Sequence, residues 1–306
     1  MNVTLTGATG FVGSRLVAKL LAGGHQVHVL GRRRSSKLPA SVSFSEWNAA
    51  SEPPPDTVAG ADAVIHLAGE PVGQRWTSQA KARIRDSRVE GTRLLVSALA
   101  RQPRRPAVLV CASAIGIYGS RGDETLTETS ASGQGFLAEV VTDWESAAQA
   151  AEPFGIRVVP VRFGIVLGPG GALAKMLPAF RLGVGGRIGS GRQWMSWIHI
   201  VDAVDLSLFA LGNSALRGPV NAVSPHPVTN LEFTREFAAA LHRPAIFPVP
   251  EAALKLVFGE MAGMLLGSQR VLPEAAEAAG FRFRYPELRP ALEDVLASRN
   301  SDSEAQ

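Results

Sequence analysis

The sequence predicts an α/β fold: a doubly wound parallel sheet with helices on both faces, followed by a smaller α/β C-terminal lobe. Apolar runs of strand length alternate with helical patterns over about the first half of the 306 residues, which is typical of parallel sheets. A glycine-rich turn follows the first run, and the regular alternation stops near residue 165. We expect a first domain over 1–165, to which elements after 198 return, a second lobe over 166–300 and a frayed tail over 301–306.

The chain begins with a strand, a tight turn and a helix. Gly7, Gly10 and Gly13 let the backbone turn sharply and approach a pyrophosphate closely, and the helix N-terminus offers free N–H groups to phosphates. Any tight turn between a strand and a helix can use glycine, so the triplet alone is weak evidence. A second strand over 26–30 supplies the context of a Rossmann-type dinucleotide site.

Basic residues follow this second strand. An acidic residue there would bind the ribose 2′-hydroxyl of NAD, whereas an arginine accommodates the 2′-phosphate of NADP. The stretch 31–34 holds no Asp or Glu and begins Gly31-Arg32. We therefore expect NADP(H), with Arg32 contacting the 2′-phosphate. The alternative is a run of exposed arginines in a surface loop.

The remaining elements of the first half follow in order. Small residues close a buried strand over 61–69, where they let a cofactor pass close to the backbone. His66 in this strand either faces a ligand or is packed and hydrogen-bonded in the core. Lys81, Arg85 and Arg88 recur on one face of a helix, which is either solvated or the wall of an anion-binding cleft. We expect strands over 42–47, 107–113 and 156–162, and helices over 77–98 and 135–151.

The second half has shorter elements. Asp202 is the expected N-cap of a helix that runs to Leu211. Thr229 and Glu232 resemble a capping box at the start of another helix. We also expect a strand over 221–223 and a last helix over 286–297.

Composition excludes several classes of protein. The only cysteine is Cys111, so no internal disulfide can form, and a reducing compartment is expected. No apolar run is long enough to span a membrane, and the chain enters a strand at once, so we expect no signal peptide. The arginine cluster over 101–105 lacks interleaved aromatic residues, which argues against nucleic-acid binding. We expect a cytoplasmic monomer or homodimer with a small-molecule substrate and no metal, membrane or nucleic-acid partner.

These motifs occur in the order found in extended short-chain dehydrogenases/reductases. They are Thr6-Gly7-x-x-Gly10-x-x-Gly13, His66-Leu67-Ala68-Gly69, Ser113 to Tyr118-Gly119, Val161-Arg162 and Trp197-Ile198-His199-Ile200-x-Asp202. The chain resembles one branch more closely, the NAD-dependent epimerase/dehydratase-like proteins with a characteristic C-terminal domain, often labelled "epimerase family protein". The marks of that branch are Leu67-Ala68-Gly69-Glu70, Ser87-Arg88, Asp143-Trp144-Glu145, Gly189-Ser190-Gly191 and Tyr285-Pro286-Glu287-Leu288.

The resemblance implies a set of site residues. Ser113 would face the reacting carbon and donate a hydrogen bond to a carbonyl, and Tyr118 is the second catalytic candidate. The cofactor would be bound by Gly7, Thr9, Gly10, Phe11, Val12, Gly13, Gly31, Arg32, Leu67, Ala68, Gly69, Glu70, Arg88, Ala112 and Arg162.

The chain departs from the wider superfamily at the Tyr-x-x-x-Lys pair, whose tyrosine exchanges a proton with the substrate. Counting back from Glu145, the expected tyrosine and lysine positions fall near Leu137 and Val141, and neither side chain can transfer a proton. Arg88 stands where relatives usually have an asparagine before Gly-Thr. The proton donor is left open among Tyr118, Glu70, His199 and a water held by Ser113.

Three functions are compatible with this resemblance. The leading interpretation is an NADP(H)-binding oxidoreductase or epimerase-like enzyme. The alternative is a catalytically reduced NADP(H)-binding protein that senses the cofactor or binds a partner. A nucleotide-sugar epimerase with the standard mechanism is third, because it would need the missing pair.

Overall fold

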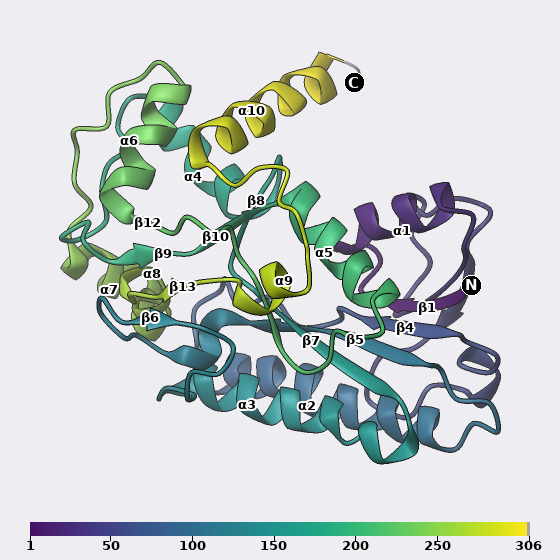
Figure 1. The fold of residues 1–306 in the computed structure, drawn as a ribbon. Helices are drawn as coiled ribbons and strands as arrows, with labels where there is room; N and C mark the ends of the chain where they lie inside the picture. The colour runs from purple at the N-terminus through teal and green to yellow at the C-terminus, as the bar shows by residue number, and fades with distance from the viewer. Residues whose placement is uncertain (305–306) are drawn as a thin grey trace.

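The structure, a computed structural model, describes residues 1–304 of the chain and the side chains of residues 1–298. Its centre is a seven-stranded parallel sheet in the order β11-β7-β5-β4-β1-β2-β3 (Figure 1). The order reverses at β1, which lies between β2 and β4. The strands are β1 (Asn2–Thr6), β2 (Gln26–Gly31), β3 (Ser43–Glu46), β4 (Ala63–His66), β5 (Val108–Ala114), β7 (Arg157–Phe163) and β11 (Val220–Ala222). The predicted doubly wound, Rossmann-type sheet is confirmed.

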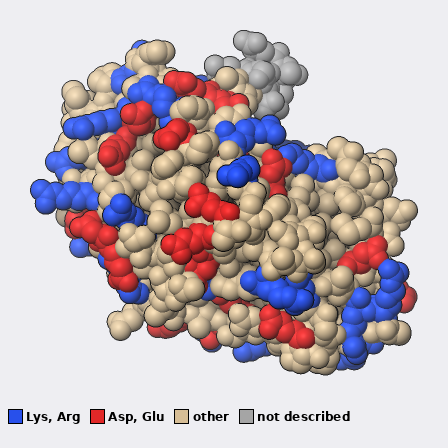
Figure 2. Space-filling model, viewed as in Figure 1, with Lys and Arg blue, Asp and Glu red and all other residues tan. Residues whose placement is uncertain are grey.

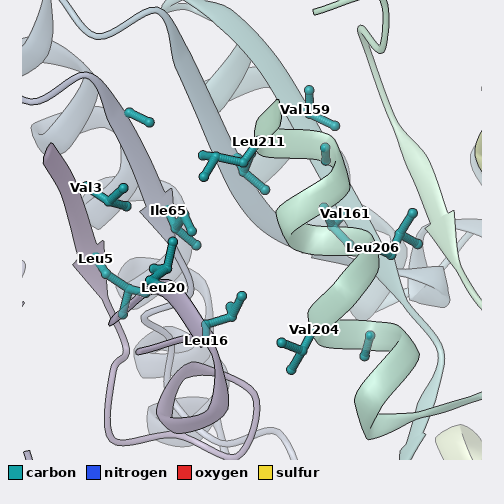
Figure 3. Close-up of a cluster of buried hydrophobic side chains, with 14 of the residues drawn as sticks. Val3, Leu5, Leu16, Leu20, Ile65, Val159, Val161, Val204, Leu206 and Leu211 are labelled. Atoms are coloured by element: carbon teal, nitrogen blue, oxygen red, sulfur yellow. The ribbon is translucent and has the colours of Figure 1, made fainter. Parts of the chain in front are cut away.

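Helices cover both faces of this sheet. Figure 1 shows α2 (Ser78–Ala100) and α3 (Phe136–Gln149) below the sheet, and α1 (Gly13–Ala22) and α5 (Ile200–Gly212) above it. Side chains alternate between the two faces, as the pleat requires. Ala63 and Ile65 of β4 belong to the cluster under α1 and α5, whereas Val64 belongs to the cluster under α2. Figure 3 shows Leu16 and Leu20 of α1, with Val204, Leu206 and Leu211 of α5, over the strands.

A second lobe holds most of the remaining elements and has a core of its own, built around Trp197, Phe233 and Phe237. β6 (Thr125–Leu126) pairs with β13 (Arg270–Val271), β8 (Ile165–Leu167) with β10 (Trp197–His199), and β9 (Trp194–Met195) with β12 (Val228–Thr229). Its helices are α4 (Gly171–Arg181), α6 (Asn230–Ala240), α7 (Glu251–Phe258), α8 (Ala262–Leu266) and α10 (Leu288–Glu304). Helix α9 (Glu274–Ala278) packs instead against β11 of the main sheet. Short 3₁₀ turns are η1 (Pro55–Thr57), η2 (Ile115–Tyr118), η3 (Glu152–Phe154) and η4 (Gly259–Met261).

Within the described residues, no helix is both long and apolar enough to cross a membrane. Acidic and basic side chains are interspersed on the face shown in Figure 2. Helix α10 continues past residue 300, and residues 305 and 306 of the predicted tail lie outside the described residues.

The start of α5 differs from the prediction. The N-cap is His199, whose Nδ1 accepts the N–H of Val201 at 3.2 Å, so Asp202 lies inside the first turn. The Asp202 carboxylate instead accepts the N–H groups of Arg284 at 2.7 Å and Tyr285 at 2.9 Å. Asp202 therefore joins a distant segment to α5, a role that local sequence cannot reveal. The capping box of Thr229 with Glu232 at the start of α6 is confirmed.

A buried network of hydrogen bonds joins the ends of β1 and β4. The Thr6 hydroxyl accepts the N–H groups of Leu67 at 3.2 Å and Ala68 at 3.1 Å, and lies 2.7 Å from His66 Nδ1. With both lone pairs of the hydroxyl occupied, its proton goes to Nδ1, so His66 is neutral and carries its hydrogen on Nε2. Nε2 lies 3.1 Å from the Thr92 hydroxyl. His66 is thus the packed, hydrogen-bonded residue of the two alternatives.

We expect the stability of the protein to fall as the pH drops below 6.5, in part because of His66. Burial lowers the pKa of His66 from 6.5 to about 4, so the unfolded chain takes up a proton at a higher pH than the folded one. Its contribution to stability is complete above pH 6.5 and is lost progressively toward pH 4, by at most about 1.4 kcal/mol per pH unit. Urea unfolding at several pH values should therefore show a shallower pH dependence for His66→Gln than for the wild type. Equal slopes would contradict the assignment.

Candidate functional site

A cavity of about 1470 Å³ opens at the carboxyl ends of the strands where the sheet order reverses. Open α/β sheets bind ligands at this place, because the loops from the two halves of the sheet diverge there. Of the predicted cofactor residues, the cavity is lined by Gly7, Thr9, Gly10, Gly31, Arg32, Leu67, Ala68, Gly69 and Glu70. Phe11, Val12, Gly13, Arg88, Ala112 and Arg162 are not among its lining residues.

The three glycines of the first turn have different physical roles. A Cβ on Gly7, whose φ is +73°, would lie 2.7 Å from the carbonyl carbon of Leu67, and one on Gly13 would lie 2.2 Å from the Gly7 oxygen. Both glycines are therefore required for the backbone to pack. A Cβ on Gly10 would meet only the Gly7 oxygen, at 3.1 Å. Gly10 lines the cavity, so its missing side chain leaves room for a ligand.

The turn ends at the positive end of α1. The helix begins at Gly13 with Val12 as an N-cap that provides no side-chain cap. Gly10 donates its N–H to Gly7, and Ser14 donates to Gly10. Within the described residues, the N–H groups of Phe11 and Val12 find no protein acceptor. Two donors at a helix N-terminus beside the cavity make a site for an anion.

The Phe11 side chain joins this turn to the second lobe. A Cβ on Gly168 would lie 2.6 Å from Phe11 Cζ, and one on Gly170 would lie 3.1 Å from the same ring. The guanidinium of Arg15 lies 5.0 Å from the ring centre on Phe11. The aromatic ring therefore packs in a cradle of glycines just before α4, and only the backbone of Phe11 is free for a ligand.

Three arginines line the cavity beyond the end of β2. Arg34 donates to the main-chain oxygens of Val42 at 3.0 Å and Pro39 at 3.2 Å, so it holds its own loop. Arg32 and Arg33 are exposed and form no hydrogen bond or ion pair with any described residue. Both guanidinium groups are thus available to a phosphate.

The predicted catalytic residues belong to a buried network away from this cavity. The Ser113 hydroxyl donates to Glu145 at 2.5 Å, and the same carboxylate accepts two hydrogen bonds from Arg162, at 2.8 and 2.7 Å. Arg162 also donates to the Tyr118 hydroxyl at 2.8 Å, which donates to Asn221 at 2.7 Å. The proton of each hydroxyl is thus committed to a protein acceptor, and burial raises the pKa of Tyr118.

The hydrogen bonds of this network hold the side chains of Ser113, Tyr118 and Arg162 in the protein interior. All three side chains are buried, and none lines the cavity. Ala112 packs near Trp144 and Val89. The direction in which a side chain at a strand end points depends on its tertiary partners, here Glu145 on α3, so the motif Ser113 to Tyr118 did not reveal it.

The basic face of α2 is neither wholly solvated nor a uniform cleft wall. Lys81 forms an ion pair with Glu260 and lies 5.3 Å from the ring centre of Phe136, which contacts Trp76 edge-on at 5.2 Å. These contacts link the first domain to η4 of the second lobe. Arg85 pairs with Asp143 at 2.6 Å, and Arg88 is half-buried behind Gly69.

Further cavity residues come from the end of β3, which sequence reasoning missed. Trp47, Asn48 and Ala49 line the cavity next to Arg32. The signal was present, because the carboxyl ends of neighbouring parallel strands meet at one edge of the sheet. The sequence predicts strand β3, and its place in the parallel sheet brings the residues after it to that edge.

The parallel sheet, the glycine turn and the cavity at the strand-order reversal define a Rossmann-type α/β protein. Residues 3–222 match the model of the NAD dependent epimerase/dehydratase family, and residues 249–295 match a domain of unknown function, DUF1731. The chain belongs to the NAD-dependent epimerase/dehydratase family.

Relatives of this chain carry the name predicted for its branch. Epimerase family protein YfhF of Bacillus subtilis is 38% identical over 98% of this chain and 100% of its own length. The chloroplastic SDR39U1 homolog of Arabidopsis thaliana is 40% identical over 97% of this chain and 87% of its own. The structure of human epimerase family protein SDR39U1 with NADPH is 37% identical, with a TM-score of 0.88, over 97% of this chain and 99% of that one. The predicted membership of this branch is confirmed.

We expect Gly10→Val to abolish NADPH binding and to leave the protein folded. The new side chain would project where Gly10 borders the cavity, and its Cβ would meet only the Gly7 oxygen, at 3.1 Å. Gly212→Val, at an exposed glycine whose Cβ would meet nothing within 4 Å, is the matched control. Fluorescence titration with NADPH measures binding, and circular dichroism checks the fold. Wild-type affinity in a folded Gly10→Val protein would show that the turn does not hold phosphate.

We expect Tyr118→Phe to lower the free energy of unfolding by about 1–3 kcal/mol, because buried Arg162 and Asn221 each lose a hydrogen-bond partner. NADPH affinity should not change, since Tyr118 is fully buried and its hydroxyl is already hydrogen-bonded to Arg162 and Asn221. Urea unfolding and an NADPH titration of the same preparation test both statements. A stable variant with weakened NADPH binding would show that Tyr118 takes part in cofactor binding.

Proposed function

We propose that this protein binds NADP(H) in the cavity at the β1–β4 crevice and acts as an oxidoreductase or epimerase-like enzyme on a small molecule. The single observation that carries this proposal is the pair of free guanidinium groups, Arg32 and Arg33, in the same cavity as the Gly10 turn. The human relative whose structure contains NADPH supports the choice of cofactor.

The residues of the cavity suit each part of such a cofactor. Arg32 and Arg33 would contact the 2′-phosphate, and the N–H groups of Phe11 and Val12 would donate to the pyrophosphate. Leu67 and Ala68 are half-buried and Gly69 is exposed, and the rest of the molecule can lie along this segment. When bound, the cofactor supplies or accepts a hydride.

The protein's own contribution to catalysis would be binding and orientation. The hydroxyls of Ser113 and Tyr118 donate to Glu145 and Asn221, so proton transfer by either would require the network to open. Glu70 is the carboxylate of the segment after β4 that lines the cavity, where Gln74 donates to it at 3.2 Å. The same carboxylate oxygen lies 3.6 Å from Arg83 Nε, so Glu70 is the donor candidate named from the sequence that lines the cavity, and it is held there by two neighbours.

A second function is favoured by the same buried network. General acid help typically contributes about 10²–10⁴-fold to a rate, and this chain has committed its Ser and Tyr hydroxyls to structure. A catalytically reduced protein that senses NADP(H) or binds a partner would need no such donor. A broad panel of carbonyl compounds and nucleotide sugars, assayed for NADPH oxidation, separates the two: turnover supports the enzyme, and tight binding without turnover supports the sensor.

The remaining expectations belong to this proposal. A cytoplasmic location fits the single buried thiol, Cys111, although one plant relative is named as chloroplastic. A monomer or homodimer that uses a small-molecule substrate, without nucleic acid or membrane, stays a prediction.

We expect NADPH to bind at least about tenfold more tightly than NADH, since an arginine–phosphate contact is worth roughly 1.5–3 kcal/mol. Arg32→Ala should reduce this preference, and Arg32→Ala combined with Arg33→Ala should remove most of it. Arg105→Ala is the control, because Arg105 lies in the loop before β5, at the amino ends of the strands, whereas the cavity opens at their carboxyl ends. Calorimetric titration with both cofactors measures the ratio, and equal affinities in the wild type would refute the preference.

A further inference from the structure

Arg88 is a half-buried cation that has no carboxylate partner among the described residues. Its Nη1 donates to the main-chain oxygens of Glu70 at 2.8 Å and Ile84 at 3.2 Å. Its Nε and Nη2 groups have no described acceptor. A cation removed from water is unfavourable unless an acceptor or an anion compensates it. Burial accordingly lowers the pKa of Arg88 to about 10, and the charge of Glu70 offsets only part of the effect.

The guanidinium of Arg88 lies directly behind the cavity wall. A Cβ on Gly69 would lie 3.1 Å from Arg88 Cζ, 3.2 Å from Nη2 and 3.3 Å from Nη1. Gly69 is exposed and lines the cavity. Because this residue has no side chain, nothing larger than its backbone screens the charge from a ligand that passes over it.

The strand order decides which half of a dinucleotide would meet Arg88. Strand β2, which precedes Arg32, lies on one side of β1, and β4, which precedes Gly69, lies on the other. A molecule with its 2′-phosphate at Arg32 and its pyrophosphate at Gly10 extends its other half toward β4. That half carries the nicotinamide.

Arg88 also contacts α3, the helix on which short-chain dehydrogenases/reductases carry the lysine of the Tyr-x-x-x-Lys pair and this chain does not. Its Cζ is 5.1 Å from the ring centre of Trp144 on α3. Trp144 follows Val141 by three residues, which is less than one helical turn. Val141 is the position where the resemblance to short-chain dehydrogenases/reductases leads us to expect a lysine. A cation from α2 therefore packs against α3, about one turn beyond the place of the missing lysine.

We propose that Arg88 binds the phosphate and ribose of the nicotinamide half of NADP(H), and so supplies the positive charge that Val141 does not. This inference rests on the NADP(H) binding proposed above. The free Nε and Nη2 hydrogens of a planar guanidinium can reach a phosphate oxygen and a hydroxyl together. The carbonyls of Glu70 and Ile84 hold the group in place before the cofactor arrives, which lowers the entropic cost of binding.

The test compares Arg88→Gln with Arg85→Gln, which removes an exposed arginine of the same helix. NADPH, NADH and adenosine 2′,5′-bisphosphate, which lacks the nicotinamide half, are titrated against each protein. We expect Arg88→Gln to weaken NADPH and NADH equally, by about tenfold or more, and to leave the bisphosphate unchanged. Arg32→Ala should weaken NADPH and the bisphosphate, which carry the 2′-phosphate, and leave NADH unchanged. Arg85→Gln should bind all three ligands with wild-type affinity. Arg88→Lys, which keeps the charge without the planar fork, should give a smaller loss.

Two results would overturn the role of Arg88. Wild-type NADPH affinity in folded Arg88→Gln would make the residue purely structural. Equal weakening of the bisphosphate would mean that the substitution disturbs the whole cavity, and thermal unfolding of each variant would show this independently. A wild-type protein that binds no NADPH would instead refute the proposed function itself.

Discussion

The close approach of the ends of β1 and β4 is the constraint on which the rest of the structure depends. At Gly7 the two backbones are so near that a Cβ would lie 2.7 Å from Leu67. Thr6 fixes this distance by accepting two N–H groups of the segment after β4 and donating to a neutral His66. The approach brings the turn before α1 and the segment from Leu67 to Glu70 to one cavity, so the ligand site is a consequence of how two neighbouring strands pack.

A second buried network shapes what the protein can do chemically. Glu145 and Arg162 form an ion pair that is buried on both sides and hydrogen-bonded throughout, which is the condition under which such pairs are tolerated. The network holds β5, β7 and α3 together at the carboxyl edge of the sheet. It does so with the two hydroxyls that the family resemblance would otherwise offer for catalysis, so structural integrity and proton transfer compete for the same groups.

The sequence predicted the main sheet and its helices because their periodicity and their flanking glycines are local signals. Strands of two residues, such as β6 and β13, carry no such signal, and they form because distant segments meet. The glycine turn, Arg32 and the segment 67–70 lie at the cavity as chain order suggests. Ser113 contacts Glu145, Asp202 contacts the segment at 284–285, and Arg88 contacts Trp144. These partners lie far away in the sequence, so local patterns could not predict the contacts.

Hydrogen–deuterium exchange with and without NADPH tests most directly whether the crevice between β1 and β4 is the cofactor site. Binding should slow exchange at Phe11 and Val12, whose N–H groups lack a protein acceptor among the described residues, and in the segment 67–70. Exchange at the exposed residues Leu182 and Val184 of the second lobe should not change. Protection confined to the second lobe, with no change in the turn at 7–13, would contradict the account.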